Sequence, residues 1–210
     1  LEQLLEDRVP AKKEIYGYLS TDVGQDLVVP VMIGAGEKDH GVRRLLKALR
    51  HDTPGPALAA ERIGCDPNGA SVVQIFKTLH AGHAGKLSIG RVMAGTVKEG
   101  DVLGDEKLGT LLSMQGDKTG KRPQAEAGQI VAIGRADSLM AGETLRADGM
   151  RAMLEGWPVP PPSSYAVALH AENRQDEVKL TGALHKLVEE DCSLVAEQDA
   201  EMQQLVLRGQ

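Results

Sequence analysis

RVMAGTVKEGDVL, residues 91–103, places an apolar stretch on each side of a four-residue turn. That turn, KEGD at residues 98–101, and a second one, AEAG at residues 125–128, supply residue types that tolerate tight or left-handed conformations. Short apolar runs surround these turns, at residues 71–79, 86–93, 107–114 and 129–133. Evenly spaced short strands separated by such turns are typical of a small barrel. The sequence therefore predicts an antiparallel β-barrel over residues 57–148.

The residues before the barrel follow a pattern of helix, strand and helix. Residues 10–19 predict a short helix, and the apolar run at residues 27–33 predicts a buried strand. Pro30 inside that run removes a backbone donor, which favours a sheet edge or a bulge. Apolar residues at helical spacing between positions 42 and 49 predict a second helix, with Asp39 as its N-cap. This order is typical of the end of an α/β domain whose other strands we expect to be missing, because one strand cannot build a two-sided parallel sheet.

After the barrel, the proline-rich run WPVPPP at residues 157–162 predicts a stiff, extended spacer. It is followed by a pattern of strand, helix, strand and strand. The predicted elements are residues 165–171, 176–190, 194–197 and 204–208. This order predicts a split βαβ sandwich that lacks its last helix.

Composition and charge limit the possible functions. The 210 residues allow two or three small domains, and 41% hydrophobic with 26% charged residues is an ordinary globular composition. No apolar run is long enough to span a membrane, and residues 1–10 do not resemble a secretory signal, so we expect a cytoplasmic protein. Cys65 and Cys192 lack metal-ligand spacing, which favours thiols in a reducing compartment. The net charge is −6, but residues 71–148 carry 10 Lys and Arg against 9 Asp and Glu, so contacts with phosphate are expected there first.

Three stretches, in this order, resemble elongation factor G and its paralogues. VPVMIGA at residues 29–35, with KDHGV at 38–42, is similar to the last GTPase strand and the loop that contacts the guanine base. Residues 91–103 and AGQIVAIG at 127–134 are similar to the second domain of the family. LHKLVEEDCSL at residues 184–194 resembles a characteristic run of the third domain. The resemblance therefore extends over nearly the whole chain.

This resemblance implies a multi-domain internal fragment of a translation factor. Residues 1–56 would be the α/β remnant of a GTPase domain, 57–148 the β-barrel, 149–162 a linker, and 163–210 a truncated, ferredoxin-like α+β domain. The implied function is that of a cytoplasmic, GTP-dependent translocase that binds RNA and protein of the small ribosomal subunit. The fragment would dock on the ribosome and relay the nucleotide state.

The nucleotide-binding parts of such a factor are not expected in this chain. Gly85 and Lys86 are followed by Leu87, which does not complete a phosphate-binding P-loop, and no Asn-Lys-x-Asp motif is present. We therefore predict no enzyme activity and no cofactor for the chain itself, and GTP with magnesium in a full-length parent. Where the family usually has Ser-Ala, the chain has Gly34 and Ala35, so only the backbone N–H of Ala35 carries over as a guanine contact.

Two basic groups are candidates for contacts with ribosomal RNA: His80, His83 and Lys86, and then Lys118, Lys121 and Arg122. Because aromatic residues make up only 2% of the chain, such contacts would involve the RNA backbone and shape. His80 and His83 also have the spacing of half a zinc site, for which Cys65 and His170 are conceivable partners. An exposed histidine-bearing loop is the commoner arrangement, so no metal is predicted.

Two further motifs have alternative interpretations. Gly34 and Gly36 follow a predicted strand, as in a dinucleotide-binding turn, but Asp39 occupies the third glycine position and would repel a pyrophosphate. The acidic run at residues 189–191 could form a paired-carboxylate acid and base site, whereas a solvated helix end is commoner.

The sequence also leaves open what the parent does. A specialised paralogue, such as a ribosomal-protection factor, would carry the same domains. A stand-alone barrel that binds a protein or an oligosaccharide is an alternative from another class, because a barrel fold alone does not define a function.

Overall fold

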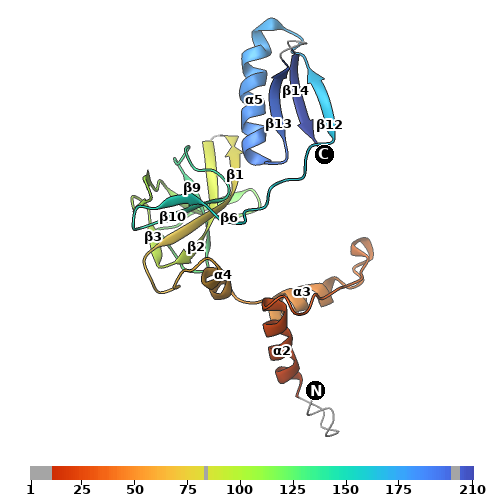
Figure 1. The fold of residues 1–210 in the computed structure, drawn as a ribbon, viewed down its shortest axis with the longest axis vertical. Coiled ribbons are helices and arrows are strands. Elements are labelled where there is room, and N and C mark those ends of the chain that lie inside the picture. The colour runs from red at the N-terminus through yellow and green to blue at the C-terminus, as the bar shows by residue number, and fades with distance from the viewer. Residues whose placement is uncertain (1–10, 83–84, 200–203) are drawn as a thin grey trace. The chain divides into compact units, whose positions relative to one another are not determined.

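The computed structural model describes residues 11–82, 85–199 and 204–210, and the chain divides into two compact units, Leu1–Gly64 and Cys65–Gln210 (Figure 1). No helix among the described residues combines the length and the apolar character needed to cross a bilayer.

In the first unit, the regular elements of residues 11–64 are all helices. They are α2 (Lys12–Gly24), the 3-10 turn η1 (Gly36–Lys38), α3 (Val42–His51) and α4 (Pro56–Arg62). The predicted first helix is present and runs five residues beyond position 19, to Gly24. The second predicted helix is present as α3.

The predicted strand at residues 27–33 is wrong. These residues form no strand, and the side chains of Val29, Val31 and Ile33 are 79%, 86% and 95% exposed. A strand needs a neighbour to complete its ladder of hydrogen bonds. Among the residues described in this unit, the only bridge joins Ala35 to His40, so the segment has no partner strand.

The predicted N-cap of α3 is also wrong. Asp39 has a φ of 56° and ends η1, and the residue that precedes α3 is Gly41, with a φ of 79°. The chain needs left-handed backbone at both positions to turn from η1 into α3, and Gly41 adopts that conformation without steric cost. No side-chain hydrogen bond caps α3 as a result.

The second unit begins with an antiparallel sheet of seven strands in the order β11-β10-β1-β2-β9-β6-β7. Its strands are β1 (Val72–Ala81), β2 (Gly85–Ala94), β6 (Leu111–Gln115), β7 (Lys118–Lys121), β9 (Ile130–Gly134), β10 (Glu143–Arg146) and β11 (Arg151–Met153). The four apolar runs of the sequence correspond to β1, β2, β6 and β9, although β6 begins later than predicted.

The antiparallel arrangement is confirmed, but the predicted closure into a barrel is wrong. The strands β11 and β7 end the sheet, and the described residues form no ladder between them. Two separate ribbons complete the fold: β3 (Thr96–Lys98) with β8 (Gln124–Glu126), and β4 (Val102–Leu103) with β5 (Glu106–Lys107). Glycines with positive φ at positions 95, 100 and 104 turn the chain so often that these strands are too short to continue the main sheet.

One hydrophobic core lies between the main sheet and the two ribbons. Its largest fully buried side chains include Ile75 from β1, Ile133 from β9, Leu103 from β4 and Val97 from β3. The core thus draws on all three sheets, which explains why alternating apolar residues extend over a region longer than any single strand.

The last part of the second unit is a three-stranded sheet with one helix packed along it. Strands β12 (Tyr165–Leu169), β13 (Val195–Asp199) and β14 (Gln204–Gly209) pair in the antiparallel order β12-β14-β13. Helix α5 (Glu177–Glu190), preceded by the 3-10 turn η3 (Arg174–Asp176), packs along this sheet (Figure 1). The predicted order of strand, helix, strand and strand is confirmed, and residues 154–164 between β11 and β12 contain no helix or strand.

Candidate functional site

The C-terminal end of α5 is attached to the β1–β2 hairpin, and we call this contact the joint. Its residues are Thr78, His80, Lys86, Glu189 and Glu190. The Nε2 atom of His80 lies 2.7 Å from Oε2 of Glu189, and Nζ of Lys86 lies 3.3 Å from the same oxygen. The carboxylate of Glu189 therefore bridges two neighbouring strands.

Two backbone contacts complete the joint. The hydroxyl of Thr78 donates a hydrogen bond to the backbone carbonyl of Glu189, and the backbone N–H of His80 donates to the carboxylate of Glu190. The carbonyl of Glu189 belongs to the last turn of α5, where carbonyls have no partner within the helix. The hairpin thus provides a hydrogen-bond donor for a backbone carbonyl at the end of the helix.

The pairing of the two strands brings these side chains together. In the antiparallel register, His80 faces Lys86 and Thr78 faces Ser88, and residues two apart along a strand share one face of the sheet. On the helix, the buried Leu184 anchors α5 and precedes Glu189 by five residues. Regular strand and helix geometry therefore aligns an imidazole and an ammonium group with one carboxylate.

The lysine of the joint is unusually buried. Its side chain is 6% exposed, and Nζ donates a hydrogen bond to the backbone carbonyl of Asp137 at 2.8 Å. A buried ammonium is costly unless it is paired and hydrogen-bonded. Lys86 meets both conditions only while Glu189 is in place.

The surroundings of Glu189 lower its pKa. Burial alone would raise the pKa of this carboxyl, but the hydrogen bond from His80 and the charge of Lys86 outweigh that effect. Because the pKa is lowered on folding, the carboxylate stabilises the joint above its unfolded pKa. That contribution is lost as the pH falls through the folded value, on the acid side of the ordinary glutamate range.

A small cavity adjoins the joint. Its volume is about 250 Å³, and it is lined by Thr78, Lys86, Leu139, Met140, Ala141, Val188, Glu189 and Cys192. Cys192 is exposed, Cys65 is buried, and both are thiols. The lining is mainly apolar, so the ion pairs of the joint lie beside a region of low polarity, where charges interact more strongly than in water.

Three comparisons with known proteins show what the chain is similar to. Residues 159–210 match the family model for domain III of elongation factor G. The chain is 39% identical to an elongation factor G-like protein of Synechocystis, an alignment that covers 100% of this chain and 31% of that protein. It is 30% identical to elongation factor G 1 of Geobacter sulfurreducens, over 100% of this chain and 33% of the relative. A crystal structure of a Thermus thermophilus protein aligns with a TM-score of 0.76 and 30% identity, over 99% of this chain and 31% of that one.

The chain is similar to elongation factor G and to an elongation factor G-like protein. It spans about a third of the length of the curated relatives that it matches. The resemblance that the three sequence stretches indicated is therefore confirmed.

The elongation factor G resemblance predicted a guanine contact by Ala35. In the structure, the backbone N–H of Ala35 donates to the carbonyl of His40 at 3.0 Å, and the N–H of His40 donates back at 3.1 Å. A base contact by Ala35 stays a prediction, and it requires this bridge to open. A Cβ on Gly34 would lie 2.8 Å from the carbonyl oxygen of His40, so this loop has no space for the serine that elongation factor G usually carries.

The structure separates the two predicted RNA-contact groups. His80 and Lys86 lie in the joint, whereas Lys118 and Lys121 are exposed on β7, and β9 and β6 lie between that strand and β2. Arg122 follows β7 and donates to the carbonyl of Gln124 at 3.1 Å. His83 lies outside the described residues. Whether any of these side chains contacts RNA stays a prediction.

The structure bears on three alternative interpretations of the sequence: a dinucleotide-binding turn, a zinc site and an acidic helix end. The dinucleotide-binding interpretation is wrong, because the residues after Gly34 form a single 3-10 turn and offer no helix start to a pyrophosphate. His80 is engaged with Glu189, and no group of three metal-ligating side chains occurs in the described part of the chain. Glu189 and Glu190 lie at the end of α5 as expected, and the side chain of Glu189 is 45% exposed, but both residues also hold the joint.

The next residue, Asp191, ends the helix. Its carboxylate accepts hydrogen bonds from the hydroxyl and the backbone N–H of Ser193, at 2.7 and 2.9 Å, and these bonds lower the pKa of Asp191. Such a turn directs the chain from α5 into β13. The third acid of the run therefore has a local structural role.

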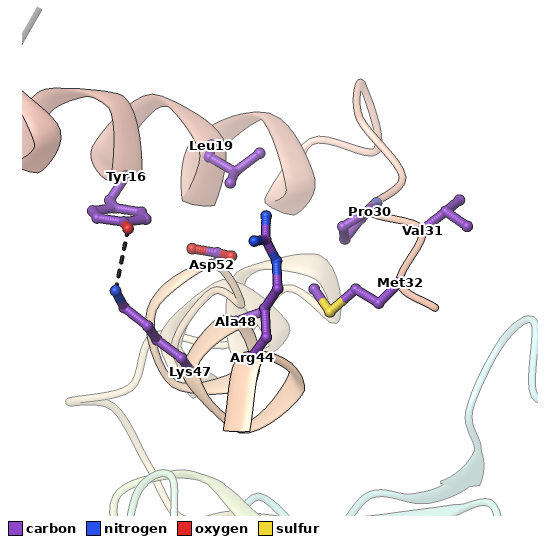
Figure 2. Close-up of a pocket in the computed structure, with 9 residues that line it drawn as sticks. All are labelled: Tyr16, Leu19, Pro30, Val31, Met32, Arg44, Lys47, Ala48 and Asp52. Carbon is purple, nitrogen blue, oxygen red and sulfur yellow. Dashed lines mark hydrogen bonds between the residues drawn. The ribbon is translucent and has the colours of Figure 1, made fainter. Parts of the chain in front are cut away.

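A larger cavity lies in the first unit and contains none of the predicted site residues. It has a volume of about 320 Å³ and is lined by Tyr16, Leu19, Pro30, Val31, Met32, Arg44, Lys47, Ala48 and Asp52 (Figure 2). The ammonium of Lys47 donates to the hydroxyl of Tyr16 at 3.3 Å and lies 5.3 Å from the centre of its ring. Oδ1 of Asp52 is buried and accepts no hydrogen bond from the described residues.

Proposed function

We propose that this chain is the ribosome-docking and relay portion of a GTP-dependent translation elongation factor. The observation that carries the proposal is the alignment of the whole chain with an elongation factor G-like protein at 39% identity. The family-model match at residues 159–210 supports it independently for the C-terminal part. The division at residues 1–56, 57–148, 149–162 and 163–210 is part of this proposal.

In this proposal, the β-sheet part of the second unit docks on the small ribosomal subunit. Lys118 and Lys121 are exposed on β7 at the end of the main sheet, and no described residue forms an ion pair with either of them. Unpaired cations on a sheet edge are available to phosphate groups, and each phosphate contact releases counterions from the RNA. Arg122 extends this basic edge by one residue.

The joint supplies the relay. A conformational change at the nucleotide site of the parent would be transmitted to the ribosome by parts of the protein that move together. The bridge from Glu189 to His80 and Lys86 fixes α5 to the β1–β2 hairpin, so these two elements would move together. GTP and magnesium would be held, and GTP hydrolysed, by other parts of a longer cytoplasmic protein. Ala35 would contribute only a backbone contact to the guanine base.

A specialised paralogue is the second candidate. The identity to the elongation factor G-like protein, 39%, exceeds the 30% identity to elongation factor G 1 of Geobacter sulfurreducens. A paralogue, for example one that protects ribosomes, would use the same docking surface for a different outcome. The two candidates share the prediction that the chain binds ribosomes.

Co-sedimentation with small ribosomal subunits over a salt series tests docking. We expect binding at about 50 mM salt that weakens steeply by about 200 mM. A variant with Lys118→Glu and Lys121→Glu should bind less tightly, and the slope of log affinity against log salt should fall by about one per lost phosphate contact. The matched control carries Lys12→Glu and Lys13→Glu on α2, with the same change in net charge, and should bind like the unmodified chain.

One outcome would reject docking. If the chain does not sediment with subunits at the lowest salt but is retained on an immobilised oligosaccharide or protein ligand, the stand-alone binding module is correct instead.

A further inference from the structure

We propose that the basic side of α3, in the first unit, is a binding surface for the phosphate backbone of RNA. The proposal goes beyond the proposed function, because docking there involves the main sheet of the second unit and no residue of α3. It rests on the charge, the exposure and the helical spacing of four side chains, which we call the basic stripe: Arg43, Arg44, Lys47 and Arg50.

The basic stripe concentrates positive charge on one short helix. The sequence of α3 is VRRLLKALRH, which contains these four Arg and Lys residues and no acidic residue. The whole chain, in contrast, has a net charge of −6. Positive charge gathered in one place on an acidic protein is typical of a surface that binds an anionic partner.

Helical spacing places these cations on one side of α3. Positions 43, 47 and 50 are separated by four and three residues, so their side chains lie on the same face, and position 44 lies beside position 47. All four side chains are exposed. From position 43 to position 50 the stripe extends over about 10 Å, at a rise of about 1.5 Å per residue. Such a row of cations fits a row of phosphates better than it fits a single anion.

The cations of the basic stripe are available to an external partner. Within residues 11–64, Arg62 forms an ion pair with Asp26, but no described residue forms an ion pair with a member of the stripe. Lys47 donates a hydrogen bond to the neutral hydroxyl of Tyr16, which leaves its charge uncompensated (Figure 2). An RNA phosphate can therefore pair with the stripe without breaking an ion pair of the described chain.

The basic stripe is unfavourable for α3 itself. Arg43 and Arg44 lie in the first turn, which contains no acidic residue, although the N-terminal end of a helix carries a partial positive charge and favours acids. Lys47 also has like charges three and four residues before it and three residues after it, and these repel it. Sequence choices that oppose local stability are typical of functional surfaces. Phosphate groups would relieve both repulsions.

The apolar side of α3 favours RNA over a membrane surface as the partner. Leu45, Leu46 and Leu49 lie on the other side of the helix and are 45%, 60% and 53% exposed. In an α/β domain this side of a helix packs against the sheet, so it would not be free to insert into a bilayer. The basic stripe is the side that stays accessible. Three of its four residues are arginines, whose planar guanidinium binds phosphate through two parallel hydrogen bonds.

Binding of the full chain to a short fluorescent RNA duplex, measured by fluorescence anisotropy from about 50 to 200 mM salt, tests the proposal. The chain carries Lys118→Glu and Lys121→Glu, which remove the basic edge at β7 and isolate the contribution of α3. In this background, Arg43→Gln with Arg50→Gln should weaken binding about tenfold at the lowest salt. The slope of log affinity against log salt should fall by about two, one for each lost phosphate contact.

Two further variants make the result specific to the basic stripe. Lys12→Gln with Lys13→Gln on α2 changes the net charge equally at exposed positions of the same unit, and should leave the affinity unchanged. Arg43→Lys with Arg50→Lys keeps both charges, so the salt slope should be retained and the affinity should fall by no more than about threefold. An unchanged far-ultraviolet circular dichroism spectrum would show that each variant keeps its helices.

The proposal is overturned if Arg43→Gln with Arg50→Gln binds the duplex as tightly as the background chain, or if the α2 variant weakens binding equally. It is also overturned if polyglutamate displaces the RNA at equal charge concentration, which would indicate an acidic protein partner, or if the chain binds anionic vesicles and not RNA. None of these results bears on docking through β7, which co-sedimentation with ribosomal subunits measures separately.

Discussion

At the residue scale, two glycines decide the path of the loop before α3. A Cβ on Gly34 would meet the carbonyl oxygen of His40 at 2.8 Å, and one on Gly41 would meet the carbonyl oxygen of Ile33 at 3.0 Å. The loop closes because both positions lack a side chain, and the bridge between Ala35 and His40 depends on that closure.

We predict that Gly34→Ser opens this bridge. The added Cβ would force backbone atoms apart, at a cost of about 1–3 kcal/mol. Amide exchange at Ala35 should then accelerate. Gly36→Ser is the matched control, because a Cβ at that position has no atom within 4 Å, and exchange at Ala35 should not change. Equal exchange in the two variants would show that close contact at Gly34 is unimportant.

A second residue-scale prediction concerns Arg151, which fastens β11 to its neighbours. Its guanidinium lies 3.0 Å from the carboxylate of Glu143, whose side chain is 9% exposed, and 3.0 Å from that of Asp105, which is 75% exposed. Arg151→Met would leave the buried carboxylate of Glu143 without a cation, so we expect a loss of about 2–4 kcal/mol in the free energy of unfolding.

Denaturant unfolding of the second unit measures this loss. Asp105→Asn removes the exposed partner and should shift the midpoint very little, because exposed ion pairs contribute little. If Asp105→Asn destabilises the protein as much as Arg151→Met, the buried pair is not the main contribution of Arg151.

At the element scale, the sequence predicted those elements whose partners are also in the described chain. The apolar runs at β1, β2 and β9 form strands because each has a neighbour in the main sheet. Residues 27–33 have the same apolar character and form no strand, since a ladder requires a second chain segment that the pattern cannot reveal. The prediction of a closed barrel was wrong for a related reason. The periodicity of apolar residues shows which residues are buried, but it does not show whether the first and last strands of a sheet pair with each other.

We predict that α5 is held mainly through one side of its apolar stripe. Leu184 is 6% exposed and Leu187 is 41% exposed. Leu184→Ala should therefore cost about 2–4 kcal/mol and Leu187→Ala about 1 kcal/mol. Amide exchange in β13 and β14, which share the layer with α5, would report the difference, and equal effects would contradict the packing described.

At the scale of the whole molecule, the candidate site was predicted only in part. His80 and Lys86 were identified from their charge and their position in a hairpin, but their partners were not, because Glu189 and Glu190 lie 109 and 110 positions away from His80. No local pattern encodes such a contact. The family, in contrast, was identified from the sequence, since three separate motifs in the correct order carry more information than any single motif.

The two units should also differ in their protection from exchange. Residues 29–33 have no strand partner among the described residues, whereas β1, β2 and β9 lie inside a seven-stranded sheet. We expect the amides of Val29, Val31 and Ile33 to exchange with little protection, and those of the central strands to exchange only on global unfolding. Strong protection across residues 29–33 would mean that the segment has a partner in solution.

The central claim is that this chain docks where elongation factor G docks. Competition for ribosomes between the chain and a full-length bacterial elongation factor G, at low salt, tests it most directly. We predict that increasing amounts of the chain displace the full-length factor, and that the variant with Lys118→Glu and Lys121→Glu displaces it less effectively. If both proteins bind the same ribosomes at saturating concentrations without displacement, the docking claim is contradicted.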